Sequence, residues 1–261
     1  MSQRHGHGIH SIDRLANRSG MRDWNAGFKT ALSLGTLILC LAADHIAVSV
    51  CVILAFAVLQ TVKGKLPLDD YLALLCVPLA FVLLGGIAVA CDLSSIPAGE
   101  WNMPLPGGYL CASMESMWTA FQLMLKALGA VSAMYLLALT TTAAELVNVL
   151  HRAHLPALLC TLMYLIYRFV FVLIDQYSRM RDAAGARLGW RDFRTSYRSF
   201  GGTAGNLLVL ALRRARVYDD AMAARGYDGT LRFLEEKKTV HGSQIVCMLL
   251  FWAVLLALAW I

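Results

Sequence analysis

Long runs of apolar residues alternate with short polar segments along most of this chain. Residues 30–60 are apolar except for Asp44 and His45 at their centre. A single helix over this run would be roughly 45 Å long, whereas the hydrocarbon core of a bilayer is about 30 Å thick. We therefore predict that the run breaks at Asp44-His45 into two membrane-spanning helices.

Three further apolar runs each predict one more span. Residues 69–91 predict the third span, although it contains Pro78, because membrane helices tolerate a breaker when neighbouring groups satisfy the freed backbone atoms. Residues 117–142 predict the fourth span and residues 243–261 the last. The fold class expected from this pattern is an all-α polytopic membrane protein with about five transmembrane helices.

The segment between the fourth and the last span follows a different pattern. Residues 143–153 read as a short amphipathic helix, 157–174 are apolar, and beyond Asp175 dense charges accompany apolar residues at helical spacing. Long amphipathic helices with basic faces lie on a membrane surface or bind a partner. The predicted organisation is a cytoplasmic N-terminal segment (1–23), transmembrane helices 1–4 (24–142), a cytoplasmic region of amphipathic helices (143–240, with 157–174 membrane-proximal) and a C-terminal transmembrane helix (243–261).

Composition agrees with a membrane protein. Hydrophobic residues make up 58% of the 261 residues and charged residues only 15%, whereas soluble domains carry about a quarter charged residues. This balance disfavours a disordered chain, a disulfide-stapled secreted domain and an ordinary soluble enzyme.

The net charge of +6 is unevenly distributed. Fourteen of the 23 Lys and Arg residues lie in 168–238, and none lies in 66–125, which includes the Pro- and Gly-rich loop 92–116. Because basic loops stay cytoplasmic, we predict a cytoplasmic N-terminus and an outside C-terminus. We expect no nucleic-acid partner. Cys91 and Cys111 flank the outside loop, and the sequence leaves open whether they pair.

Two short motifs in the cytoplasmic region carry the candidate chemistry. They are Ala186-Arg187-Leu188-Gly189 and Ala224-Arg225-Gly226. Glycine supplies the left-handed conformation that ends a helix, and alanine lets another surface approach closely. Arginine at a helix C-terminus complements the helix dipole and projects a planar fork of donors toward a carboxylate. The motifs are therefore candidate docking sites, with two ordinary helix caps as the alternative.

Other polar residues are weaker candidates. Lys126 in the fourth span either faces a partner or snorkels to the interface. The terminal residues His5, His7 and His10 either bind a cation or have no fixed structure, and His151 and His154 are more typical of solvated positions than of ligands. No His, Cys, Asp and Glu set in the apolar runs has metal-ligand spacing. We therefore predict no metal site, no catalytic residue and no cofactor, and the substrate-binding residues stay unknown.

The chain resembles a known family at several points. The segments that carry the resemblance are Ser11-Ile12-Asp13-Arg14-Leu15-Ala16, Thr140-Thr141-Thr142, Leu155-Pro156, Tyr167-Arg168, the two Ala-Arg-Gly-type motifs and the terminal apolar helix. Together they are similar to the transmembrane coupling subunit of energy-coupling-factor transporters, most closely the cobalt/nickel type called CbiQ. The resemblance covers nearly the whole chain. Leu188 departs from the family pattern, which has glycine there.

The resemblance implies a transmembrane coupling component of an importer in the prokaryotic plasma membrane. Two cytoplasmic ATP-binding-cassette ATPases would be its partners, with Arg187 and Arg225 engaging a groove on each. A separate membrane subunit would bind the cobalt or nickel ion, and a further small membrane subunit is compatible with the family. The sequence contains no GxxxxGK[ST] motif, so this chain is expected not to be an enzyme and its partners would hydrolyse ATP.

Two other functions compete with this reading. Asp182 and the residues up to Arg187 faintly resemble the Asp-rich motif of membrane phosphatidyl-transferases, but a hard cation needs several clustered oxygens and only Asp192 is near. A stand-alone metal carrier would need polar residues lining several spans, and these spans are nearly uncharged. Both alternatives are disfavoured.

Overall fold

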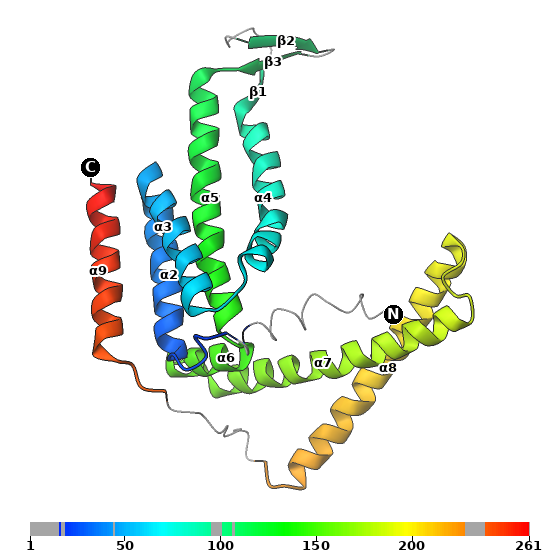
Figure 1. Ribbon diagram of the computed structural model, residues 1–261. Coiled ribbons are helices and arrows are strands. Elements are labelled where there is room, and N and C mark those ends of the chain that lie inside the picture. Colours follow the sequence, from blue (N-terminus) through cyan, green and yellow to red (C-terminus); the bar gives the residue numbers. More distant parts are fainter. Residues whose placement is uncertain are drawn as a thin grey trace. The chain divides into compact units, whose positions relative to one another are not determined.

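The protein is divided into two compact units. The structure, a computed structural model, describes residues 16, 19–43, 45–94, 101–105, 108–227 and 238–260. The first unit, here called the membrane unit, comprises the described residues up to Thr142 together with 238–260. The second, here called the hairpin unit, comprises 143–227. Figure 1 shows the helices of both units.

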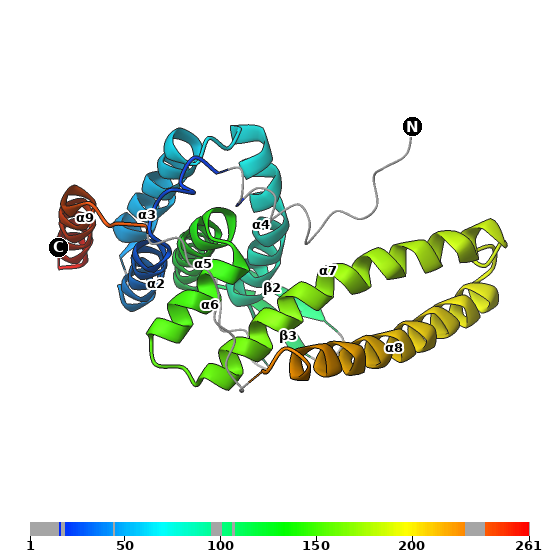
Figure 2. The same ribbon diagram turned by 90° about the horizontal axis from the view of Figure 1, so that it is seen from below.

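The membrane unit is a helix bundle built around one central helix. Helix α5 packs against α2, α3 and α4, and α9 packs against α2 and α3. Figure 2 shows α5 seen along its axis with α2, α3 and α4 around it. The elements are α2 (Ala26–Ala42), α3 (Ile46–Val58), a π-helical turn η1 (Leu59–Lys63) that continues α3, α4 (Leu68–Ala90), α5 (Met114–Thr140) and α9 (Gly242–Ala259).

The predicted break in the first apolar run is confirmed. Helix α2 ends at Ala42, the backbone of Ala43 and His45 is extended, and α3 begins at Ile46. Asp44 itself lies outside the described residues. The chain therefore reverses direction between two helices, as the length of the run requires.

A hydrogen bond from a neighbouring helix compensates for the proline in α4. Pro78 has no backbone N–H, so the carbonyl of Leu74, four residues earlier, lacks its helical donor. The hydroxyl of Tyr135 on α5 donates to this carbonyl at 2.9 Å. The structure thus identifies the neighbour that makes a proline tolerable in this apolar helix.

A fully buried lysine closes one end of the bundle. Lys29 is 0% exposed. Its ammonium donates to the backbone carbonyl of Thr140 at 2.6 Å and to that of Met21 at 3.5 Å. Because a buried ammonium is costly without hydrogen-bond acceptors, these contacts tie the segment before α2 to the end of α5. Lys29 was not among the residues predicted from the sequence.

The loop between α4 and α5 contains a small antiparallel sheet that the sequence did not predict. Its strands are β1 (Cys91–Ser94), β2 (Trp101–Leu105) and β3 (Gly108–Ala112), in the order β1-β3-β2. Cys91 lies opposite Ala112 in the register, and Cys111 lies opposite Asp92. The side chains of these strands lie outside the description, so the question of a Cys91–Cys111 pair also lies outside it.

The predicted fold class, an all-α polytopic membrane protein, is confirmed, with this sheet as an addition. Among the described residues, five helices are long and apolar enough to cross a membrane, namely α3 with η1, α4, α5, α7 (Ala157–Ala186) and α9. The number agrees with the prediction, but one member of the set differs. Helix α2 has only 17 residues and falls just below the usual length, whereas the first half of the 30-residue α7 is apolar enough to qualify.

Candidate functional site

The candidate site lies on a long helical hairpin. The hairpin unit consists of α6 (Ala143–Arg152), α7 and α8 (Phe193–Ala223). Helix α7 begins directly after Pro156, which is its N-cap residue. Helices α7 and α8 are connected by residues 187–192 and run back alongside each other, as Figure 2 shows.

The first motif forms the C-terminal cap of α7. The N–H of Gly189 donates to the carbonyl of Ala184 at 2.8 Å, and the N–H of Leu188 donates to that of Gly185 at 3.0 Å. Leu188 has a φ of 58°. These two hydrogen bonds around one left-handed residue define a Schellman motif, in which Arg187 is the last residue before the left-handed position.

The second motif forms the same cap at the end of α8. The N–H of Tyr227 donates to the carbonyl of Met222 at 3.1 Å, and the N–H of Gly226 donates to that of Ala223 at 3.0 Å. Gly226 has a φ of 72°. Arg225 therefore holds the position in α8 that Arg187 holds in α7. The two arginines are equivalent in local backbone geometry, although the sequences around them differ.

One detail of the sequence prediction is wrong. Glycine was expected to provide the left-handed residue in both motifs, and this holds for Gly226, but in the first motif Leu188 adopts that conformation. Gly189 serves another purpose. It is buried, and a Cβ there would lie 2.6 Å from the hydroxyl of Ser199 and 2.8 Å from the carbonyl of Ala184. Glycine is needed at 189 because the turn packs closely against α8.

The two arginines are accessible and far apart. Ala186, Arg187, Ala224, Arg225 and Gly226 are all exposed. Within the part of the chain that the structure describes, neither arginine forms an ion pair. They lie at opposite ends of α8, whose 31 residues correspond to about 45 Å of helix. Two separate acidic or carbonyl-lined surfaces could therefore be contacted at the same time.

An aromatic cluster connects α7 and α8 away from the turn. The guanidinium of Arg168 donates to the Tyr218 hydroxyl at 3.4 Å and lies 5.7 Å from the centre of its ring. The ring of Phe169 contacts the same tyrosine edge to face at a centroid distance of 5.3 Å. Sequence reasoning singled out Arg168 but missed Tyr218 and Phe169. Aromatic residues within highly charged helices were the signal that would have identified them.

Helix α8 leaves large apolar side chains uncovered. Phe193 is 90% exposed and Tyr197 75% exposed, and Leu208 and Leu212 are both more than half exposed. Exposed apolar stripes of this kind mark sites of protein or membrane interaction. The hairpin unit therefore presents apolar surface between its two arginine caps.

The weaker candidates remain separate from this site. Among the described residues, no three His, Cys, Asp or Glu side chains are close enough to hold a metal ion. Asp182 is exposed on α7, and Asp192 is exposed just before α8.

The remaining histidines and Lys126 are also separate from the arginine caps. His154 lies beyond the end of α6, so it does not share a helix with His151. His5, His7 and His10 are outside the described residues. Lys126 lines a cavity of about 160 Å³ with His45, Ser49, Thr119 and Gln122.

Comparison with known proteins identifies the family. The sequence model of the family described as CbiQ, cobalt transport protein, matches residues 18–240. The chain belongs to this family. The match spans the central helices of the membrane unit and the whole described hairpin unit, so it includes both arginine motifs.

Individual relatives agree with the CbiQ assignment. The chain is 30% identical over 249 residues to the cobalt transport protein CbiQ of Rhodobacter capsulatus, covering 95% of this chain and 97% of the relative. It is 26% identical over 251 residues to an uncharacterized protein of Methanocaldococcus jannaschii, covering 96% and 92%. A putative fused cobalt transport protein CbiMQ of Methanocorpusculum labreanum is 25% identical over 260 residues, covering 95% of this chain but 42% of that protein.

The CbiQ family and the five apolar helices together make this chain a multi-pass membrane component of cobalt transport. The predicted transport class is therefore confirmed. The finer expectations, which concern the coupling role, the partners and the orientation, are taken up below.

Proposed function

We propose that this protein is the transmembrane coupling component of an ATP-driven energy-coupling-factor importer for a transition-metal ion. The observation that carries the proposal is the pair of equivalent, exposed arginine caps at the two ends of α8. Two docking elements with the same backbone geometry, one at the end of α7 and one at the end of α8, suit two copies of one partner. The expected partners are two cytoplasmic ABC-type ATPase subunits.

In this mechanism the ATPases and the ion site lie in other subunits. The sequence has no phosphate-binding GxxxxGK[ST] loop, so the proposed role is mechanical. ATP-driven movement of the ATPases would shift the ends of α8 through Arg187 and Arg225. The exposed apolar side chains of α7 and α8 would pass that movement to a substrate-binding membrane subunit.

The identity of the transported ion is proposed from the family. Its description and the names of its relatives concern cobalt transport, and we extend the proposal to cobalt or nickel. The fused relative, in which a segment similar to this chain accounts for less than half of the protein, supports a further membrane subunit as partner. The proposed location is the prokaryotic plasma membrane, with the hairpin unit and the N-terminus in the cytoplasm and the C-terminus outside.

The two arginines provide the direct test. Arg187→Glu and Arg225→Glu should each weaken ATPase binding, because breaking a buried charged pair at an interface costs about 2–5 kcal/mol and reversing the charge costs at least as much. The measurements are co-purification of the ATPases with the full chain and Co²⁺ or Ni²⁺ uptake by cells. Arg216→Glu is the matched control, because it makes the same charge change at an exposed position of α8 outside both caps.

Normal co-purification and uptake in both variants would overturn the coupling role. Loss of ATPase binding in Arg216→Glu to the same degree would show that only the overall charge of α8 matters. Ion uptake by vesicles that contain this chain alone would instead support the stand-alone carrier.

A further inference from the structure

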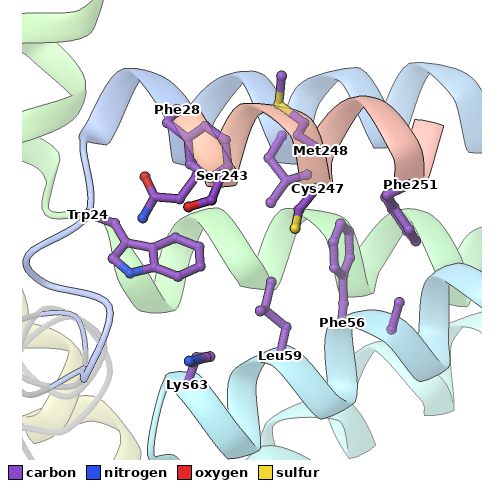
Figure 3. A pocket seen from close by; sticks show the side chains of 12 residues that line it. Trp24, Phe28, Phe56, Leu59, Lys63, Ser243, Cys247, Met248 and Phe251 are labelled. Carbon is purple, nitrogen blue, oxygen red and sulfur yellow. The ribbon is translucent and has the colours of Figure 1, made fainter. Parts of the chain in front are cut away.

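A groove in the membrane unit is separate from the proposed coupling site. It lies between α2, η1 with the end of α3, and the first half of α9, and its volume is about 370 Å³. Figure 3 shows the side chains that line it. Pockets of this size accept an organic ligand, and their few polar groups determine which one.

The second half of α9 is held closely against α2. The indole N–H of Trp252 donates to the Thr36 hydroxyl at 3.1 Å. The same indole ring lies over Gly35, where an added Cβ would overlap it. The lining residues of α9, from Ser243 to Phe251, all precede this contact. The groove lies beside these residues.

One end of the groove carries hydrogen-bond donors. Lys63, Ser243, Gln244 and Trp24 line it there, and Figure 3 shows the labelled Lys63, Ser243 and Trp24 grouped at that end. Lys63 is exposed, and among the described residues it forms no ion pair. Gln244 uses its amide oxygen to accept from the N–H of His241, which leaves its NH₂ group as a donor. Among the described residues, no carboxylate lines the groove.

The other end of the groove is apolar. Phe56 and Phe251 face each other there with ring centroids 6.0 Å apart, and Leu59 and Met248 line the stretch between them and the donors. These residues belong to α3 with η1 and to α9, which are both candidate membrane spans. The apolar end of the groove is therefore expected at the depth of the lipid acyl chains. The end with the donors is expected at the membrane surface, because Lys63 and Ser243 lie at the ends of these spans.

We propose that this groove binds an anionic glycerophospholipid. One acyl chain occupies the apolar end, and the phosphate accepts hydrogen bonds from Lys63 and its neighbouring donors. A rim with an ammonium group and several hydrogen-bond donors favours a negatively charged headgroup, as basic residues next to membrane spans do in general. An indole at the boundary between apolar and polar regions is typical of a membrane interface. The bound lipid fills the space between α9 and the bundle.

Trp24 serves as a reporter for this site. The full chain is placed in phosphatidylcholine vesicles that contain a fixed fraction of brominated phosphatidylglycerol or brominated phosphatidylcholine, and tryptophan quenching is measured. Subtraction of the Trp24→Phe signal isolates Trp24 from the other tryptophans. We expect Trp24 to prefer phosphatidylglycerol by roughly fivefold, the effect of about one basic residue. Added inorganic phosphate should not displace the lipid, because the acyl chain contributes to binding.

Three variants separate the parts of the site. Lys63→Gln should abolish the preference for phosphatidylglycerol while quenching by phosphatidylcholine persists. Lys65→Gln is the matched control and should keep the preference, because it removes an exposed cation of the same loop that does not line the groove. Ala55→Leu fills the groove and should reduce quenching by both lipids, with thermal unfolding measured to confirm that the variant is folded.

Equal quenching of Trp24 by both lipids would overturn the proposal. Equal loss of the preference in Lys63→Gln and Lys65→Gln would also overturn it, because attraction to the whole basic surface would then suffice. Absence of Trp24 quenching would show that protein covers the groove. Each outcome is independent of ATPase binding, so the lipid site and the coupling function fail or stand separately.

Discussion

At the scale of single residues, the two helix caps have the same backbone geometry and the same arginine position, although their sequences differ. Arg187 and Arg225 both precede a left-handed residue, yet that residue is Leu188 in one cap and Gly226 in the other. A side chain with a Cβ pays about 1–2 kcal/mol for this conformation. The hydrogen bonds of the cap and the close packing of Gly189 against α8 therefore hold Leu188 in an unfavourable backbone state.

Relief of this strain is testable. Leu188→Gly should stabilise the end of α7 by about 1 kcal/mol, because Leu188 is 66% exposed and its side chain contributes little packing. Slower amide hydrogen exchange at positions 188 and 189 of the purified variant, relative to the intrinsic exchange rate of its sequence, would measure the effect. Leu188→Ala removes most of the same side chain but keeps the Cβ, so it should give no such protection. Equal protection in both variants would show that the leucine side chain, and not its backbone conformation, destabilises the cap.

At the scale of helices, α4 and α5 depend on each other through one hydrogen bond. Pro78 deprives the Leu74 carbonyl of its helical donor, and the Tyr135 hydroxyl replaces that donor. In an apolar environment an unsatisfied carbonyl is costly, because water is not available to replace the lost partner. The proline in α4 and the tyrosine in α5 therefore form a pair.

A double-mutant cycle measures this dependence. Tyr135→Phe should lower the free energy of unfolding by about 1–3 kcal/mol, because it leaves the Leu74 carbonyl without a donor. In a Pro78→Ala background the same change should cost much less, since the alanine N–H restores the helical hydrogen bond. Denaturant unfolding in detergent micelles provides the four values. An equal cost of Tyr135→Phe in both backgrounds would contradict the pairing.

At the scale of the whole molecule, the position of α7 decides the topology. If α2, α3, α4, α5 and α9 span the membrane, the two ends of the chain lie on opposite sides. If α7 also crosses, both ends lie on the same side. Crossing would move the basic residues between α7 and α9 to the outside, against the general preference of basic segments for the cytoplasm. We therefore expect α7 to remain on the cytoplasmic side.

Reporter fusions at the C-terminus distinguish these arrangements. With α7 not crossing, alkaline phosphatase fused after Ile261 should be active and green fluorescent protein at the same position should be dark. The reverse result would show that α7 spans the membrane. Fusions in the loop after Lys63 are the control, because this loop is expected in the cytoplasm with either arrangement.

Much of the architecture was predictable because it depends on local patterns. The break at Asp44-His45, the helices of the membrane unit and the long charged helices follow from apolar run lengths and helical spacing. The small sheet of residues 91–112 was not predicted, because short strands in a Pro- and Gly-rich loop have no strong periodicity. The left-handed Leu188 was missed for a related reason, since its conformation depends on packing against α8.

The sequence by itself determined the membrane class, the helical fold, the basic amphipathic region and the positions of Arg187 and Arg225, because hydrophobic periodicity and charge act along the chain. Only the tertiary structure decided that both arginines belong to equivalent helix caps and that Lys29 is buried against Thr140. It also decided that a groove with hydrogen-bond donors at one end lies beside the first half of α9. These features bring together residues far apart in sequence. They depend on how closely helices pack, which a linear pattern does not contain.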